Sequence, residues 1–419
     1  MSIFGVFLIG GVIIFSAYKG SSKNAVTVVV WGTIPQSSFN NIIQETSLYQ
    51  SKDYNVQYVE KSEENFDADF IESLASGNGP DIFMLPSEKI LKHRNKVFAI
   101  PYDVFTTRQF KDSFVEGSWI YMAPEGSLAL PVSIDPLVMY WNRTIFTEAK
   151  LTQPPKYWDE FYNLANIITR KDGALNISKS ATALGEFANI SHAKEIVLNL
   201  AMQAGTPVTT WNDDKVQSVF ANSFNKPTVP AEAAVNFYTE FANPSKPSYS
   251  WNRSLPNSTN YFLGGDLALY FGFAKEISSL QLKNPNLNFD AAVMPISRGG
   301  GINISFARFN ALAIAKSSKN ANASFSVILI LSGADGAKAF NKILKLPPAR
   351  NDLLGQKPVN AYESIFYDSA IRARSWLNPS PADTDLIFKN MIESITSGRA
   401  RTSEAVTRAN RELSDLLPK

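Results

Sequence analysis

Polar and aromatic residues follow several apolar, β-branched runs of this sequence, at the points where strands of a sheet would end. In an open α/β sheet, the loops after the carboxyl ends of the strands border a crevice. The candidates for binding there are Thr33, Gln36, Ser87, Glu88, Asn189, Gly272 and Phe273. Polar groups of this kind replace the water that a hydroxyl-bearing solute loses, and an aromatic plane such as Phe273 covers the apolar face of a sugar ring. For Ser87 and Glu88 an ordinary solvated loop is the alternative.

Most catalytic chemistry lacks its residues in this chain. There is no cysteine, which excludes disulfides, thiolate nucleophiles and thiolate-bound metals. The two histidines, His93 and His192, are far apart in sequence and offer little for a zinc site or a Ser-His-Asp triad. Neither the segment 19–23 nor the glycine run 299–301 has the spacing of a phosphate or dinucleotide loop. We therefore expect no catalytic residue, no metal and no cofactor.

Length indicates two lobes, and the charge balance gives no reason to expect nucleic acid as a partner. At 419 residues the chain is too long for one ordinary core. Hydrophobic residues make up 45% and charged residues 19%, which is a globular balance. Lys plus Arg number 40 against 38 for Asp plus Glu, so the chain has no basic field for nucleic acid.

An apolar run over residues 3–18 precedes the polar segment 19–24. It is shorter than the ~20 residues that cross a bilayer upright, and no small-x-small cleavage pattern stands out. We predict an uncleaved anchor or signal-anchor over residues 1–20, a transmembrane helix, and a linker over 21–25. The nearby lysines follow the apolar run, whereas exported domains usually have their positive charges before it. A start of the chain upstream of Met1 is a hypothesis that would resolve this disagreement.

Beyond the linker, apolar runs of strand length alternate with helical patterns. Strands at 26–31, 56–59 and 81–85 enclose helices at 39–49 and 66–75, the order typical of a parallel sheet with crossover helices. Further expected strands are 137–141, 267–271, 291–295 and 311–315, and further expected helices are 191–205, 230–241, 383–396 and 403–417. The fold class is α/β.

The segment LPVSIDPLVMYWN at 130–142, followed by Phe146 and by PPKYWDEF at 154–161, resembles the family 1 extracellular solute-binding proteins of ABC importers. The maltodextrin-binding proteins are its best-known members. Further matching segments are 79–85, 261–275, 346–350 and 397–399. Leu269 stands where the family usually has Met, the Trp-rich sugar floor is partly matched, and the lipid-anchor cysteine is missing.

This resemblance implies a two-lobed periplasmic-binding-protein-like fold with a hinge of crossing segments. The crossings are expected near 132–135, 295–298 and 347–350. The implied first lobe comprises 26–134 and 297–346, and the second 135–296 and 347–419. Asp135, at the first crossing, and Arg350 and Trp376, near the last, join the binding candidates. For Trp376 a place in the core is the alternative.

The resemblance also implies a function. A monomer on the extracytoplasmic face of the membrane would capture a small polar solute, a sugar or oligosaccharide, by hinge closure. It would then dock on ABC permease subunits. Two other readings stay open: an extracytoplasmic hydrolase, and a membrane-anchored sensor or adhesin that retains the fold.

Overall fold

The computed structural model describes residues 25–299 and 302–418, so the predicted anchor over 1–20 and most of the linker lie outside it. The first elements are β1 (Val26–Gly32), α2 (Gln36–Gln44), β2 (Tyr54–Glu60), α3 (Phe66–Ala75) and β3 (Ile82–Pro86). β1 pairs in parallel with both β2 and β3. The prediction of a parallel sheet with crossover helices is therefore confirmed for this part of the chain.

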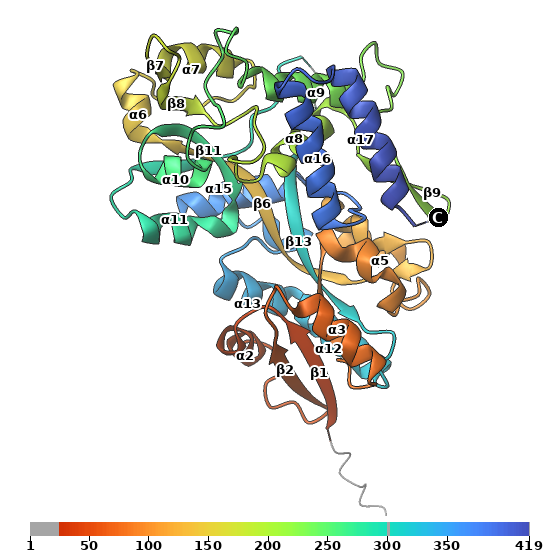
Figure 1. Cartoon of the computed structure of the whole chain (residues 1–419). Helices are drawn as coiled ribbons and strands as arrows, with labels where there is room; N and C mark the ends of the chain where they lie inside the picture. The colour runs from red at the N-terminus through yellow and green to blue at the C-terminus, as the bar shows by residue number, and fades with distance from the viewer. Residues whose placement is uncertain (1–24, 300–301, 419) are drawn as a thin grey trace, which may run out of the picture.

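The principal sheet has ten strands and continues through both halves of the molecule (Figure 1). Its main path runs β2-β1-β3-β13-β6-β11-β8-β7, while β12 pairs with β6 and β14 with β13. The strands beyond β3 are β6 (Leu130–Asn142), β7 (Arg170–Lys171), β8 (Ile177–Thr182), β11 (Leu267–Phe273), β12 (Phe289–Ala292), β13 (Ser305–Ile314) and β14 (Ala373–Arg374).

Two separate hydrophobic cores lie along this sheet, and they define the two lobes. The first core gathers residues of β1, β3, α2, α3 and the C-terminal part of β13, and the second gathers β8, β11 and helices such as α8 (Ala193–Ala204). β6 serves both, because Ile134 lies in the first core and Leu137 in the second. Its residues from 130 to 140 are all buried, as expected for a strand covered on both faces.

The chain passes between the two cores at several points, and two of the three predicted crossings are among them. The first is β6. The third is the extended segment after α13 (Ala334–Leu344), where Leu346 lies in the second core and Ala349 in the first. The two run side by side, since the amide of Ile134 donates to the carbonyl of Pro347 at 2.9 Å.

The second passage differs from the prediction of residues 295–298. Arg298 pairs there with Asp159 and Glu160 at the start of α7 (Glu160–Ile168), inside the second lobe. The chain crosses instead in β13, between Phe306 in the second core and Ala307 in the first. Proline and glycine punctuation indicated a turn at 295–301, whereas the actual crossing is a regular strand with no such signal. The bounds of the two lobes stay a prediction, with 26–134 and 297–346 in the first lobe and 135–296 and 347–419 in the second.

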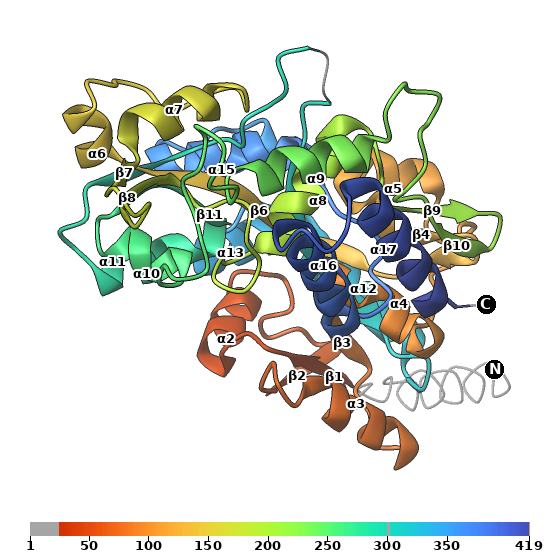
Figure 2. The ribbon, with the colours of Figure 1, turned by 45° about the horizontal axis from the view of Figure 1, so that its top comes forward.

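The hairpin of β9 (Thr209–Asn212) and β10 (Lys215–Ser218) follows α8 and reaches the first lobe (Figure 2). Its Val216 is part of the first core. The guanidinium of Arg94 lies 4.6 Å from the ring centroid of Trp211. The two lobes therefore touch through this hairpin as well as through the crossing segments.

The remaining helices and short elements cover the sheet. They are α4 (Ile90–His93), α5 (Thr107–Ser113), β4 (Met122–Ala123), β5 (Gly126–Ser127), α6 (Arg143–Glu148), α9 (Pro230–Glu240), α10 (Ser258–Leu263), α11 (Ile277–Lys283), α12 (Ala321–Ser332), α14 (Asn351–Leu354), α15 (Ala361–Ile371), α16 (Pro381–Thr396) and α17 (Thr402–Leu416), with 3-10 turns η1 (Ser87–Lys89), η2 (Arg94–Lys96), η3 (Glu116–Tyr121) and η4 (Ala274–Glu276). Among the described residues no single helix is long and apolar enough to cross a membrane, and α12 with α13 would qualify only as a pair bent by 63°.

Candidate functional site

A cavity of about 310 Å³ lies where the crossing strands meet the ends of β1 and β3. The first lobe contributes most of its wall, β6 and β13 contribute its floor, and η4 of the second lobe contributes Lys275. Its lining residues are Thr33, Ile34, Pro35, Glu63, Phe66, Met84, Pro86, Glu88, Lys89, His93, Asp135, Lys275, Arg308, Asn310, Leu344 and Leu346. This position, between the lobes and at the carboxyl ends of parallel strands, is where α/β folds bind small ligands.

Arg308 is the central charged group of the cavity. It lies on β13 and faces the cavity together with Asn310, while the alternate residues Ala307 and Phe309 point into the first core. Its Nε lies 3.1 Å from Oε1 of Glu88, and its Nη2 donates to Oε1 of Glu195 at 2.8 Å.

These two glutamates come from different lobes. Glu88 follows β3 of the first lobe, and Glu195 belongs to α8 of the second lobe. Burial tends to raise the pKa of Glu195, but the charges of Arg308, Lys194 and His192 together outweigh it and hold that pKa below its ordinary value. Burial likewise tends to lower the pKa of Arg308, and the two glutamates raise it instead. Glu195 and Arg308 therefore both stay charged at neutral pH.

Asp135 lies directly opposite Arg308 in the ladder between β6 and β13. Residues paired in this way have Cβ atoms about 5 Å apart on one face of the sheet. The side chain is 2% exposed, and its Oδ1 accepts a hydrogen bond from the amide of Lys275 at 3.0 Å. Burial raises the pKa of Asp135 to about 6, against the opposing effect of that hydrogen bond. A carboxylate and a guanidinium thus stand side by side on the cavity floor.

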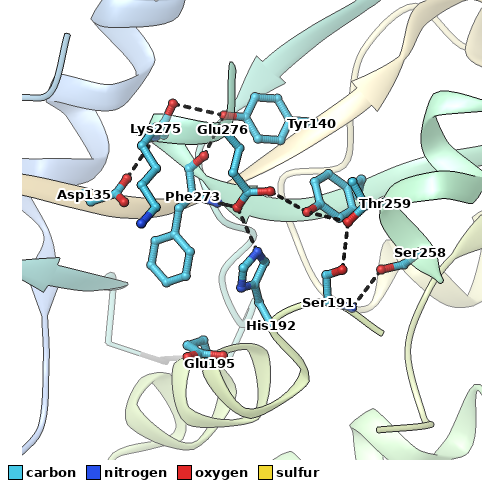
Figure 3. Close-up of polar contacts among 12 residues, drawn as sticks. Asp135, Tyr140, Ser191, His192, Glu195, Ser258, Thr259, Phe273, Lys275 and Glu276 are labelled. Carbon is cyan, nitrogen blue, oxygen red and sulfur yellow. Dashed lines mark hydrogen bonds and ion pairs between the residues drawn. The ribbon is translucent and has the colours of Figure 1, made fainter. Parts of the chain in front are cut away.

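The turn that carries Lys275 is fixed by its neighbour Glu276 (Figure 3). Glu276 accepts from the amide of Phe273 at 2.7 Å and from the hydroxyl of Tyr270 at 2.6 Å, and it pairs with Nε2 of His192 at 2.8 Å. Burial tends to raise the pKa of Glu276, but the contact with His192 and the hydrogen bonds from Tyr270 and Phe273 together outweigh it and lower that pKa. This network holds the second lobe's edge of the cavity in place.

Three of the ten residues predicted to bind line the cavity: Thr33, Glu88 and Asp135. They come from segments far apart in sequence, and the fold brings them together. Their role in binding stays a prediction.

Three other predicted residues are engaged elsewhere. Gln36 starts α2, where its amide donates to Glu60 at 2.7 Å. Ser87 is fully buried, and its hydroxyl accepts from the amide of Phe309 at 3.1 Å. The side-chain amide of Asn189 donates to the carbonyls of Asn252 and Leu255. These contacts hold loops and strands in position instead of facing the cavity.

The last four predicted residues also lie outside the cavity lining. Gly272 and Phe273 belong to β11, which is longer than expected from the sequence. Phe273 is fully buried, so its ring cannot cover a sugar here; the guanidinium of Arg308 lies 4.1 Å from its centroid. Arg350 pairs with Asp352 at 2.9 Å. Trp376 is 3% exposed and lies in the second core, as expected from the alternative interpretation of this residue as a core tryptophan.

The residues that the sequence reasoning missed are Arg308, Asn310, Lys275 and Glu195. The run SFARFNALAI at 305–314 did contain a signal, since Arg308 and Asn310 alternate with apolar residues in a strand. Within the described part of the chain, no three His, Asp or Glu side chains are grouped as a metal ion would require.

Comparison with known proteins identifies the fold and the family. No curated protein matches the sequence significantly. Among solved structures, a cyclo/maltodextrin-binding protein complexed with maltotetraose is 15% identical, with a TM-score of 0.75 over 95% of this chain and 98% of that chain. The sugar-binding protein MalE from Xanthomonas citri is 18% identical, with a TM-score of 0.73 over 93% and 97%.

A third structure, the cyclic alpha-maltosyl-1,6-maltose binding protein from Arthrobacter globiformis, is 16% identical, with a TM-score of 0.75 over 94% of this chain and 99% of that chain. These likenesses confirm the two-lobed α/β fold. The family model described as bacterial extracellular solute-binding protein matches residues 31–349. The chain therefore belongs to the family of bacterial extracellular solute-binding proteins.

Proposed function

We propose that this protein captures a sugar or oligosaccharide between its lobes and delivers it to the permease of an ABC importer. The observation that carries the proposal is the cavity at the crossing strands, where Arg308, Asp135, Glu88 and Asn310 present donors and acceptors together. Such groups suit a ligand rich in hydroxyls, because each hydroxyl both donates and accepts. Proteins of the same fold are named for binding maltodextrins and related sugars, which supports the choice of solute.

Hinge closure is the proposed mechanism. A solute that contacts both lobes favours the state in which they are close, by the difference between its contacts in the closed and open states. The three crossing segments restrict the motion to few residues. The closed form would dock on the permease, and the energy for transport would come from a separate ATPase.

We propose binding without catalysis. The family and the similar structures are binding proteins. Glu88, which lines the cavity, and the buried Glu195 are both paired with Arg308, so neither is positioned as a free general acid. Turnover of a chromogenic glycoside by the purified protein would contradict this part of the proposal.

The proposed location is the extracytoplasmic face of the membrane, as the family name indicates. Anchoring through the apolar run over residues 3–18 is part of the proposal, and it rests on sequence alone.

Calorimetric titration tests the proposal directly. The protein lacking residues 1–24 is titrated with maltose, maltotetraose, cyclic oligosaccharides, monosaccharides and polyols. We expect at least one micromolar binder, and we expect Asp135→Ala to weaken it by roughly tenfold or more. Gln36→Ala, outside the cavity, serves as the control. Absence of heat across the panel would remove the sugar claim, while the family assignment would stand.

A further inference from the structure

The cavity contains an arginine, and arginine is the residue that proteins most often use to hold carboxylates and phosphates. Taken alone, Arg308 would therefore indicate an acidic solute such as a uronic acid or a sugar phosphate. Its surroundings decide otherwise. One guanidinium faces two glutamates, at 3.1 Å to Glu88 and 2.8 Å to Glu195, so its charge is already compensated within the protein.

The geometry of the guanidinium also limits what a solute can take from it. One face lies 4.1 Å from the ring centroid of Phe273, and the Nε and Nη2 edges point at the two glutamates. Nη2 is therefore committed to Glu195, whereas Nε lies within ion-pair distance of Glu88 but has no hydrogen-bond partner among the described residues. An anionic group would have to displace Glu195 from Nη2, or approach Glu88 closely in order to reach Nε.

Asp135 adds a third carboxyl group next to the same guanidinium. An anion placed on the cavity floor would lie near the carboxyl groups of Asp135 and Glu88, which both line the cavity. Like charges repel one another strongly in a partly buried site. The ammonium of Lys275 also borders the cavity, but Lys275 is an exposed residue, and solvent weakens its attraction.

We infer that the solute is electrically neutral, with adjacent hydroxyl groups, and that Arg308 with its two glutamates rejects acidic sugars of the same size. This inference rests on the proposed function and narrows its substrate class. Arg308 donates to one hydroxyl, and Asp135, its cross-strand neighbour, accepts from the next. Glu88 and Glu195 act as positioning residues, because they orient the guanidinium and remove its attraction for anions.

The first experiment compares neutral and anionic forms of one sugar by calorimetry at pH 7.5 and low ionic strength. Maltose and maltotetraose are the neutral probes, and maltobionate and maltotetraonate, oxidised at the reducing end, are their anionic counterparts. We expect the oxidised sugars to bind at least about tenfold more weakly than the neutral ones. Equal or tighter binding of an oxidised sugar would overturn the inference.

Variants separate the effect of charge from the effect of the opened reducing-end ring. Glu88→Gln with Glu195→Gln keeps the shape of both side chains and frees the charge of Arg308, so the double variant should gain affinity for the oxidised sugars. Glu88→Gln alone should give a smaller gain, and it serves if the buried Glu195→Gln change impairs folding. Adding Arg308→Met should abolish the gain. An unchanged preference for neutral sugars in the glutamine variants would contradict the inference.

A matched control uses a surface arginine with two acidic partners. Arg298→Met removes a guanidinium that pairs with Asp159 and Glu160 and is not part of the cavity lining, and it should leave both affinities unchanged. If the wild-type protein binds neither the neutral nor the oxidised sugars, the proposed function and this inference fail together. If it binds neutral sugars but Arg308→Met retains that affinity, only the inference fails.

Discussion

Asp67 and Asp135 are two carboxyl groups near the same cavity, and their surroundings are opposite. Asp67, on α3 of the first lobe, is 19% exposed and contacts three cationic side chains: Lys89 at 3.0 Å, Lys92 at 2.6 Å and, when protonated, His93 at 3.1 Å. Asp135, on the crossing strand β6, is more deeply buried and accepts one backbone hydrogen bond, from Lys275.

The pKa values follow from these contacts. Burial tends to raise the pKa of Asp67, but the hydrogen bonds from His93, Lys92 and Lys89 outweigh it and hold that pKa well below its usual range. For Asp135 burial dominates, and the pKa rises to about 6. A carboxylate whose acceptors are saturated stabilises the fold, whereas one that is buried with few partners destabilises it and is available to a ligand. Four predictions, from the largest effect to the smallest, test this contrast.

Asp67→Asn should lower the free energy of unfolding by about 3 kcal/mol at pH 7, because it leaves Lys89 and the buried His93 without their anionic partner. Urea unfolding followed by circular dichroism measures the change. A loss below about 1 kcal/mol would show that the cluster around Asp67 is no more stabilising than an exposed ion pair.

Asp135→Asn should raise the free energy of unfolding by roughly 2 kcal/mol at pH 7, because it removes a buried negative charge. Burial of that charge is what raises the pKa of Asp135 by about two units. The same variant should lose affinity for the solute. If this substitution instead destabilises the protein, Asp135 is a structural residue like Asp67. The proposed difference between the two carboxyl groups would then be wrong.

The pH dependence separates the two groups further. Asp135 has a folded pKa above its unfolded value of 3.8, so the folded state binds more protons between those values and stability falls as pH rises from about 4 to about 6. Asp67 acts in the opposite direction, and its contribution is lost as pH falls below about 3.8. Thermal melts from pH 3 to 7 should therefore show a flatter profile between pH 4 and 6 for Asp135→Asn than for the wild type.

Lys92→Ala should cost less than about 1 kcal/mol, although its Nζ is the closest partner of Asp67. The Lys92 side chain is 43% exposed, so water replaces the ammonium when it is removed. The comparison with Asp67→Asn in the same urea assay shows whether the anion or its outer partner carries the stability of the cluster.

Much of the fold could be predicted from the sequence because its signals are local. The β-branched run at 26–31, the helix at 66–75 with its glycine stop, and the strand around Ile82 each carry their own pattern. The second crossing could not be found in this way. Local punctuation at 295–298 marks a loop against α7, whereas the crossing at 306–307 depends on how β13 is shared between two cores.

The site was partly predictable for the same reason. Rules for strand ends located Thr33 and Glu88, and the family pattern added Asp135. Arg308 was missed although it alternates with apolar residues in its strand, because its role depends on Glu88 and Glu195 from distant segments. Phe273 was assigned to the ligand, because a sequence does not show that a guanidinium already covers its ring.

The two cores have a consequence for dissecting this protein. The first draws on residues before 134, on β13 and α12, on the stretch from Ala349 to Leu377, and even on Val216 and Leu417. The second draws on the stretches between these, and also on Phe306 of β13 and on Phe366 and Trp376. Neither half is therefore a continuous piece of polypeptide, and no single cut of the chain separates the two interiors. Because residues of each lobe are interleaved in sequence with those of the other, the two lobes are expected to fold together. Such a chain favours a single cooperative melting transition.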